Sequence, residues 1–286
     1  MTASIDAHQH FWQLARGDYG WLTPELKPIY RDFMPEDLRP LLDACGIDAT
    51  IAVQAAPTVA ETEFLLSLAA RHSWIAGVVG WADLEAADAA EAITALAQTQ
   101  PKLVGLRPMI QDIPDQEWML QDRLAPALAA MAANDLTFDA LVLPRHLPVL
   151  SEFLQRYPNV RVIIDHGAKP QIRDHDFEPW ASQMQDLASR YPGVYCKLSG
   201  LATEARPEQV KAEDLRPYAG HLLQAFGPDR LIFGSDWPVV RCATDYQKWF
   251  EAVGGYTRAL SAGEKAAVMG GNAAKAYPRL VLEQRR

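Results

Sequence analysis

The feature that most constrains the fold is an alternation of short apolar segments with longer amphipathic segments, repeated eight times along the 286 residues. The apolar segments predict eight strands. Most of them are almost continuously apolar, as expected of parallel strands that are buried on both faces. The expected strands are Ser4–Ala7, Ala49–Gln54, Ile75–Trp81, Leu103–Arg107, Leu136–Leu141, Val160–Asp165, Val194–Leu198 and Leu231–Ser235.

The amphipathic segments between them predict helices. The expected helices are Glu36–Cys45, Val59–Arg71, Ala86–Gln98, Asp115–Asn134, Pro148–Tyr157, His175–Tyr191, Leu215–Phe226 and Asp245–Val253, followed by a last stretch at Ala262–Ala276. Eight strand–helix units in this length predict an α/β fold, a single-domain (β/α)8 barrel of the TIM type over residues 1–286. A doubly wound open sheet is the alternative that the alternation also allows.

The segment Phe11–Phe33 departs from this regular pattern. It is rich in aromatic residues and proline, and it is too long for a simple strand-to-helix loop. We therefore expect it to fold over another part of the molecule.

Composition narrows the classes of partner. The formal net charge is −9, and an acidic chain lacks the basic face that nucleic acids or anionic membranes require. The three cysteines, Cys45, Cys196 and Cys242, are far apart and form neither a disulfide framework nor a CxxC metal site. The N-terminal sequence MTASIDAHQHFW shows no signal-peptide pattern, and no run is apolar for long enough to span a bilayer. A cytoplasmic protein without a membrane or nucleic-acid partner is expected.

Polar residues gather where three of the predicted strands end. His8 and His10 are two residues apart and therefore point to the same face, where two imidazoles could share a metal ion or one substrate oxygen. His166 follows the sixth strand and Asp236 follows the eighth. Because the catalytic groups of such barrels lie at the carboxyl ends of the strands, we expect these four side chains to share one rim.

These residues and their surroundings resemble the amidohydrolase superfamily. The segments IDAHQHFW, VGLRP, IIDHGAKP, YCKLSGL and LIFGSDWPV are similar, in order along the chain, to the lactonase branch of the amidohydrolase-2 group, which includes L-fuconolactone and L-rhamnonolactone hydrolases. The resemblance implies a distorted (β/α)8 barrel that hydrolyses a cyclic ester, with a lactone of a sugar acid as the small-molecule partner.

Two positions depart from the members of the superfamily that bind two metal ions. Arg107 stands at the end of the fourth strand, where those members have a bridging carboxylated lysine or glutamate, and the fifth strand has no histidine. The next histidine is His146, seven residues after Asp139, and we interpret it as a surface residue. Because both the bridging group and the fifth-strand histidine are missing, a two-metal centre is disfavoured. One divalent ion, with zinc as the expected metal, could bind to His8, His10, His166 and Asp236, and catalysis without a metal is the alternative.

The residue types suggest direct attack of water on the lactone. Asp236 would act as general base, and Arg107 with the three histidines would stabilise the oxyanion. An ion pair between Arg107 and Asp139 or Asp165 is an alternative role that does not exclude catalysis. Further polar and aromatic residues near strand ends are candidates for contacts with substrate, or for packing and support around the mouth. They are Trp12, Gln54, Trp81, Asp139, Lys197 and Trp237, with Trp21 and Ser199 as additional possibilities.

Two other functions remain open at this point. A metal-dependent decarboxylase of the amidohydrolase-2 group would use the same residues of the first, sixth and eighth strands. A catalytically silent barrel that binds a sugar acid would have no need for a free carboxylate at Asp236 facing three histidines.

Overall fold

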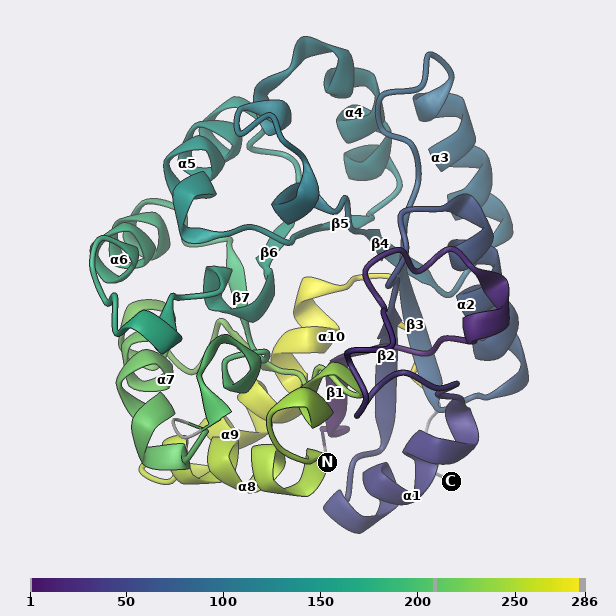
Figure 1. Cartoon of the computed structure of the whole chain (residues 1–286). Coiled ribbons are helices and arrows are strands. Elements are labelled where there is room, and N and C mark those ends of the chain that lie inside the picture. The colour runs from purple at the N-terminus through teal and green to yellow at the C-terminus, as the bar shows by residue number, and fades with distance from the viewer. Residues whose placement is uncertain (1, 208–209, 283–286) are drawn as a thin grey trace.

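The computed structural model describes residues 2–207 and 210–282, which form the predicted barrel (Figure 1). Eight parallel strands are hydrogen-bonded in chain order. They are β1 (Ile5–Gln9), β2 (Ala49–Val53), β3 (Ile75–Gly80), β4 (Leu103–Leu106), β5 (Thr137–Ala140), β6 (Val162–Ile164), β7 (Tyr195–Leu198) and β8 (Leu231–Phe233). The chain after β8 meets β1, because His10 N donates to Trp237 O at 2.7 Å and Asp236 N donates to His8 O at 2.8 Å. An open doubly wound sheet is therefore wrong for this chain.

Helices surround the ring of strands, as Figure 1 shows. They are α1 (Pro35–Cys45), α2 (Val59–Arg71), α3 (Ala89–Thr99), α4 (Ala125–Ala133), α5 (Leu147–Arg156), α6 (Trp180–Arg190), α7 (Ala212–Phe226), α8 (Tyr246–Tyr256), α9 (Ala262–Ala266) and α10 (Asn272–Ala276). Within residues 2–207 and 210–282, we find no helix that combines the length and the apolar character needed to cross a membrane.

A second buried cluster consists mainly of small and branched apolar side chains from the strands. This cluster contains Ile5, Ala7, Ala49, Ile51, Val53, Ala76, Val79, Val104, Ile163 and Ile232, together with Ala273, Ala276 and Tyr277 from the C-terminal segment. In Figure 1, α10 is visible through the ring of strands. The C-terminal segment therefore packs against the interior of the barrel, while the polar residues gather at the carboxyl ends of the strands.

Prolines explain two helices that are shorter than expected. The predicted helix Asp115–Asn134 is instead two short 3-10 turns, at Trp118–Leu120 and Asp122–Leu124, followed by α4. Pro126 lies in the first turn of α4, where its missing N–H costs nothing, but it could not continue a helix from upstream. In the same way, Pro179 directly precedes α6, which begins five residues after His175.

The predicted helix Ala262–Ala276 is interrupted between α9 and α10. A wider π-helical segment spans Ala267–Gly271. A Cβ atom on Gly270 would lie 2.0 Å from the backbone oxygen of Ala3. Gly270 therefore lets this segment approach the start of β1 closely, and the close approach coincides with the break in the helix.

His146 is buried, so the interpretation of this histidine as a surface residue is wrong. Its side chain has no exposed area. Its Nδ1 accepts a hydrogen bond from Leu143 N at 3.1 Å, at the turn that leads into α5. This hydrogen bond pairs one ring nitrogen and caps the start of the turn, while the buried Nε2 has no hydrogen-bond partner among the described residues.

Candidate active site

The carboxyl ends of β1, β4, β6 and β8 supply the polar side chains at the mouth of the barrel. His8 lies in β1 and His10 immediately follows it, while Arg107 directly follows β4. His166 and Asp236 come two and three residues after β6 and β8. All five are buried, with at most 4% of their surface exposed. The structure thus brings together the five residues that the sequence singled out for catalysis.

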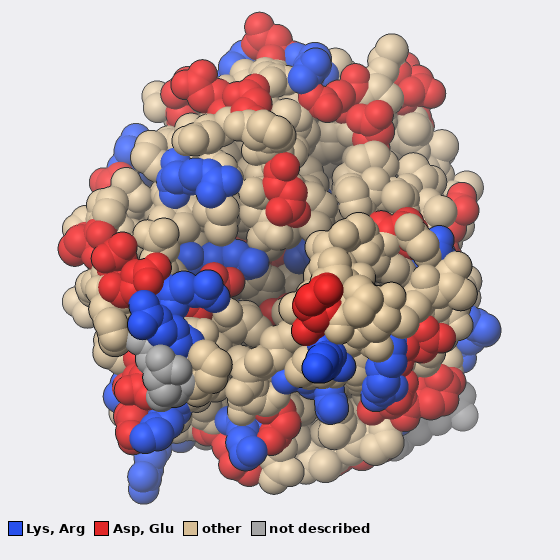
Figure 2. Space-filling model, viewed as in Figure 1, with Lys and Arg blue, Asp and Glu red and all other residues tan. Residues whose placement is uncertain are grey.

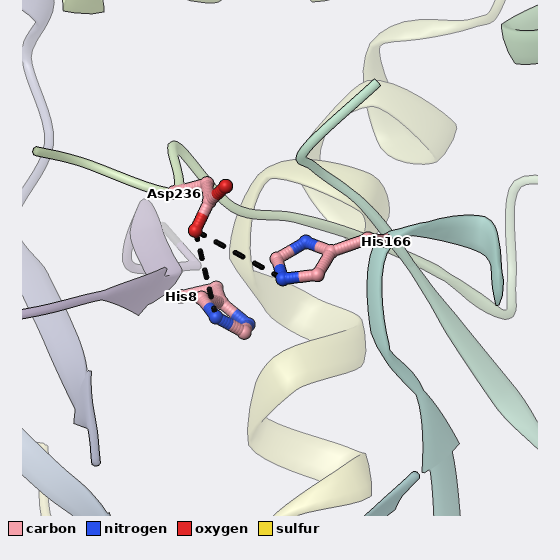
Figure 3. Close-up of side chains that lie close together, drawn as sticks. All are labelled: His8, His166 and Asp236. Atoms are coloured by element: carbon pink, nitrogen blue, oxygen red, sulfur yellow. Dashed lines mark ion pairs between the residues drawn. The ribbon is translucent and has the colours of Figure 1, made fainter. Parts of the chain in front are cut away.

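Three imidazoles converge on the carboxylate of Asp236. Its Oδ1 lies 3.3 Å from Nε2 of His10, 3.8 Å from Nε2 of His8 and 3.9 Å from Nε2 of His166. Figure 3 shows the carboxylate directed towards both His8 and His166. Asp236 has a φ of +57°, and this left-handed conformation turns the chain sharply after β8. Strained backbone of this kind concentrates at functional sites.

The other ring nitrogen of each histidine has a neighbour that orients the ring. These contacts join His10 Nδ1 to Val53 O at 2.8 Å, His166 Nδ1 to Ser199 Oγ at 2.8 Å, and His8 Nδ1 to Asp165 Oδ1 at 3.4 Å. Because a carbonyl oxygen can only accept, Nδ1 of His10 is the donor. Such contacts fix the orientation of the imidazoles and leave Nε2 of each ring facing Asp236.

Burial and neighbouring charges set the protonation states. Burial lowers the pKa of His166 to about 4, and burial together with the Lys197 ammonium holds the pKa of His8 well below its ordinary value. Burial acts in the opposite direction on Asp236, but His166 and the His10 contact outweigh it, so the pKa of Asp236 lies below its ordinary value. At neutral pH the site therefore combines neutral imidazoles of His8 and His166 with an ionised carboxylate.

This donor set fits a divalent metal ion. Ligand atoms of His8, His166 and Asp236 all lie within 4.8 Å of one another. Donors bound tetrahedrally to zinc at about 2.0–2.2 Å are about 3.3–3.6 Å apart, close to the separations around Asp236 Oδ1. Moreover, when His10 is neutral, its Nε2 lone pair faces the negative Oδ1 of Asp236. That arrangement calls for a proton or a metal ion between the two atoms.

Arg107 is held by several protein acceptors. Its Nη1 lies 3.3 Å from Nε2 of His8 and 3.4 Å from Oδ2 of Asp165, and its Nη2 donates to the backbone oxygen of Gln54. The side-chain amide of Gln54 donates in return to Arg107 O at 2.7 Å. Arg107 therefore makes the ion pair with Asp165 that was one of its expected roles, while the structure gives it no ion pair with Asp139 among the described residues.

A second layer of buried charges lies beneath His8. Lys197 Nζ lies 2.9 Å from Oδ1 of Asp165, contacts Oδ2 of Asp139, and lies 3.2 Å from Nδ1 of His8. Burial raises the pKa of Asp139 to about 6, although Lys197 opposes this shift. For Asp165, Lys197 and His8 outweigh burial and hold the pKa well below its ordinary value. Tyr277 from the C-terminal segment donates to Asp139 at 2.7 Å.

A pocket of about 210 Å³ opens above these residues. Figure 2, viewed into the mouth of the barrel, shows a hollow with both basic and acidic side chains at its edge. The pocket is lined by His10, Trp21, Ala55, Arg107, Met109, Gln111, Asp112, Leu141, His166, Lys169, Thr203, Asp236 and Val239. Its volume is below the range of about 300–1,000 Å³ that is typical for drug-sized ligands, so it suits a molecule of about one ring.

The six residues expected to contact substrate lie outside the lining of this pocket. Asp139 and Lys197 are fully buried in the layer beneath His8, and Gln54 is held by Arg107. Trp12 is fully buried and donates to Arg31 O. Trp237 is also buried, against the rings of Phe11 and Phe33, and the backbone of Trp81 is hydrogen-bonded to the side chain of Thr62. None of these six is among the described residues that line the pocket.

Trp21, an additional candidate in the sequence, lines the pocket. It comes from the Phe11–Phe33 segment, which folds over the mouth, and its Nε1 donates to Ala55 O at 2.7 Å. Other lining residues were not selected from the sequence as site residues. Lys169 lies three residues after His166 in the IIDHGAKP segment. That spacing was the available signal for Lys169. For Met109, Gln111, Asp112 and Thr203, which lie in or beside short 3-10 turns after β4 and β7, the sequence pattern carried no signal.

Glu61 of α2 ties the Phe11–Phe33 segment to the barrel. Its Oε2 accepts from the hydroxyl of Tyr19 at 2.7 Å, and its Oε1 accepts from Ala55 N at 3.1 Å. The Glu61 side chain is fully buried, and burial raises its pKa to about 7 in spite of these hydrogen bonds. Both Tyr19 and Trp21 therefore anchor the segment next to Ala55, at the edge of the pocket.

The chain after β6 makes a left-handed turn. His166, Gly167, Ala168 and Lys169 have φ values of +52°, +57°, +60° and +52°. This conformation costs about 1–2 kcal/mol for each residue with a side chain. A Cβ on Gly167 would lie 2.7 Å from the end of the Leu222 side chain, which would have to shift to make room. Trp180 Nε1 donates to Gly167 O at 2.7 Å and holds the turn in place.

Comparisons with known proteins find relatives along nearly the whole chain. An amidohydrolase family model matches residues 5–279. An L-fucono-1,5-lactonase of Burkholderia ambifaria is 48% identical over 97% of this chain and 96% of that protein. An L-fucono-1,5-lactonase of Burkholderia multivorans is 40% identical over 96% of this chain and 95% of that protein.

A solved structure shows the same fold. The crystal structure of an amidohydrolase from Burkholderia multivorans with bound zinc superimposes with a TM-score of 0.90 and 39% identity, covering 96% of this chain and 99% of that one. The resemblance inferred from the sequence is thus confirmed over nearly the whole length. This chain belongs to the amidohydrolase family.

Proposed function

We propose that this protein hydrolyses the lactone of a sugar acid, with L-fucono-1,5-lactone as the leading substrate. The observation that carries the proposal is the convergence of His8, His10 and His166 on the ionised carboxylate of Asp236 at the base of a small pocket. The two L-fucono-1,5-lactonases, which match nearly their whole length, support this choice of substrate.

In this mechanism Asp236 is the general base. A water molecule attacks the lactone carbonyl carbon while Asp236 takes its proton. The ring C–O bond then breaks, and the departing oxygen receives a proton. Because the pKa of Asp236 is lowered, it is a weak base, and it removes the proton efficiently only while the water attacks. Arg107, at the edge of the pocket, adds positive charge near the oxygen that becomes negative.

We further propose that the site holds one zinc ion, with His8, His10, His166 and Asp236 as its ligands. The neutral imidazoles of His8 and His166 are the form in which histidine binds a metal. The Burkholderia multivorans structure with bound zinc supports the choice of metal. When bound, zinc would polarise the lactone carbonyl and lower the pKa of a nearby water.

A panel of sugar lactones tests the function. Acid release would be followed with a pH indicator for 1,5- and 1,4-lactones of several sugar acids, with the spontaneous hydrolysis of each lactone subtracted. We expect the fastest turnover with L-fucono-1,5-lactone, and loss of turnover in Asp236→Asn. Release of carbon dioxide from aromatic acids without any lactone hydrolysis would instead indicate a decarboxylase. Tight binding of sugar acids without turnover would indicate a binding protein.

A further inference from the structure

Lys169 and His166 lie in the same turn and line the same pocket. The two residues are three apart in the left-handed turn after β6, and Lys169 N donates to His166 O at 2.9 Å. Side chains three apart in such a tight turn point to the same side. Both side chains line the same pocket. The strained turn that directs His166 into the pocket therefore also directs Lys169 into it.

Lys169 is more available to bind a ligand than Arg107, the other cation of the pocket lining. Among the described residues that line the pocket, these two are the lysine and arginine side chains. Arg107 is buried, and both of its terminal nitrogens are engaged with His8, Asp165 and Gln54. The side chain of Lys169, in contrast, is 22% exposed and lines the pocket.

Glu204 is the partner of Lys169 in this structure. The two charges are 3.4 Å apart, and both side chains are partly exposed. An exposed ion pair of this kind has little net stability, so a ligand anion can replace the carboxylate at low cost. Glu204 and Lys169 also border a neighbouring pocket that Arg145 and Arg173 line. Lys169 therefore stands between the two pockets.

We propose that Lys169 binds the carboxylate that ring opening creates. This inference rests on the proposed function, because it concerns the product of that reaction. Hydrolysis converts a neutral lactone into a sugar acid, which loses a proton to water and becomes an anion. The new negative charge arises inside a pocket whose available cation is Lys169. The ammonium therefore favours the open acid over any neutral molecule of the same shape.

Replacement of Glu204 should have the opposite effect on binding from replacement of Lys169. Its carboxylate competes with the ligand for the ammonium and repels a ligand anion. Replacing Glu204 with glutamine removes both effects, so Glu204→Gln should bind the acid more tightly. A loss of folding could imitate the expected effect of Lys169→Met, but it could not produce tighter binding in Glu204→Gln.

Binding without turnover tests the inference. Isothermal titration calorimetry would compare L-fuconate with L-fucitol, which has the same carbon chain and no carboxylate. We expect Lys169→Met to weaken L-fuconate binding by about 10- to 100-fold and L-fucitol binding by less than about threefold. Lys169→Arg should retain most of the affinity for L-fuconate. The matched control is Arg173→Met, which removes one positive charge from the neighbouring pocket and should change neither affinity.

Three results would overturn the inference. Equal losses for both ligands in Lys169→Met would show that the lysine supports the pocket without binding the carboxylate. An equal loss in Arg173→Met would show a long-range charge effect. Unchanged or weaker L-fuconate binding in Glu204→Gln would show that Glu204 does not compete with the ligand for Lys169. If the wild type hydrolyses lactones, any of these results rejects only the proposed role of Lys169 and leaves the proposed function intact. If it binds neither ligand and hydrolyses no lactone, the proposed function fails as well.

Discussion

Lys197 and Asp165 form an ion pair of 2.9 Å in which both side chains are fully buried. The pair lies directly beneath His8, whose Nδ1 is 3.2 Å from the lysine and 3.4 Å from the aspartate. A buried ion pair adds little net stability, but removal of one partner leaves an uncompensated charge and is costly. The arrangement therefore makes the position of His8 depend on a group that does not line the pocket.

Lys197→Met should destabilise the fold. It leaves the carboxylates of Asp139 and Asp165 without their shared cation, so we expect a loss of about 3–5 kcal/mol in the free energy of unfolding. Urea denaturation followed by circular dichroism measures this loss. Lys248→Met, a change at an exposed lysine, is the control and should leave the midpoint nearly unchanged. A Lys197→Met midpoint equal to that of the control would show that the ion pair is not important for stability.

Asp236→Asn should remove most of the activity and leave the fold intact. The amide keeps the shape of the side chain but cannot accept a proton from water, so we expect kcat/KM to fall by about 10²–10⁴-fold. Initial rates with the best lactone of the panel give this value, and thermal unfolding with zinc analysis checks that the variant is otherwise comparable. Near wild-type rates in a folded, zinc-containing variant would contradict the role of Asp236 as general base.

The order of strands and the five catalytic candidates were predictable from the sequence because both follow from a short-range pattern. An apolar run followed by a polar residue marks the carboxyl end of a buried strand, and barrel closure brings those ends together. The broken helix before Asn134 was missed because Pro126 can either begin a helix or end one. The sequence alone did not indicate which.

The walls of the pocket were less predictable for a physical reason. Trp12 and Trp237 resemble sugar-binding residues in sequence, yet they are buried among other aromatic rings. Trp21 lies in a long irregular segment whose path depends on distant contacts such as the one between Tyr19 and Glu61. Lys169 reaches the pocket through a left-handed turn that sequence periodicity does not reveal.

Removal of metal should lower both activity and stability. A ligand that binds only the folded state stabilises it by about 2.7 kcal/mol at 100 times its dissociation constant. We therefore expect a strong chelator to abolish turnover and to lower the melting temperature, and added zinc to restore both. His166→Gln should bind less zinc in elemental analysis. Full activity in a preparation with no detectable metal would establish the metal-free alternative.

Glu61→Gln should flatten the pH dependence of stability. Glu61 has an ordinary pKa of 4.5 and a folded-state pKa of about 7, so between these values the folded state binds more protons than the unfolded state. The contribution of Glu61 to stability is therefore fully present below pH 4.5 and is lost as the pH rises through 7, by about 3 kcal/mol. Glutamine stays neutral throughout. Urea denaturation of both proteins at several pH values should show Glu61→Gln gaining stability relative to the wild type between pH 5 and 8. A constant difference across this range would mean that Glu61 is already ionised in the folded protein at pH 5.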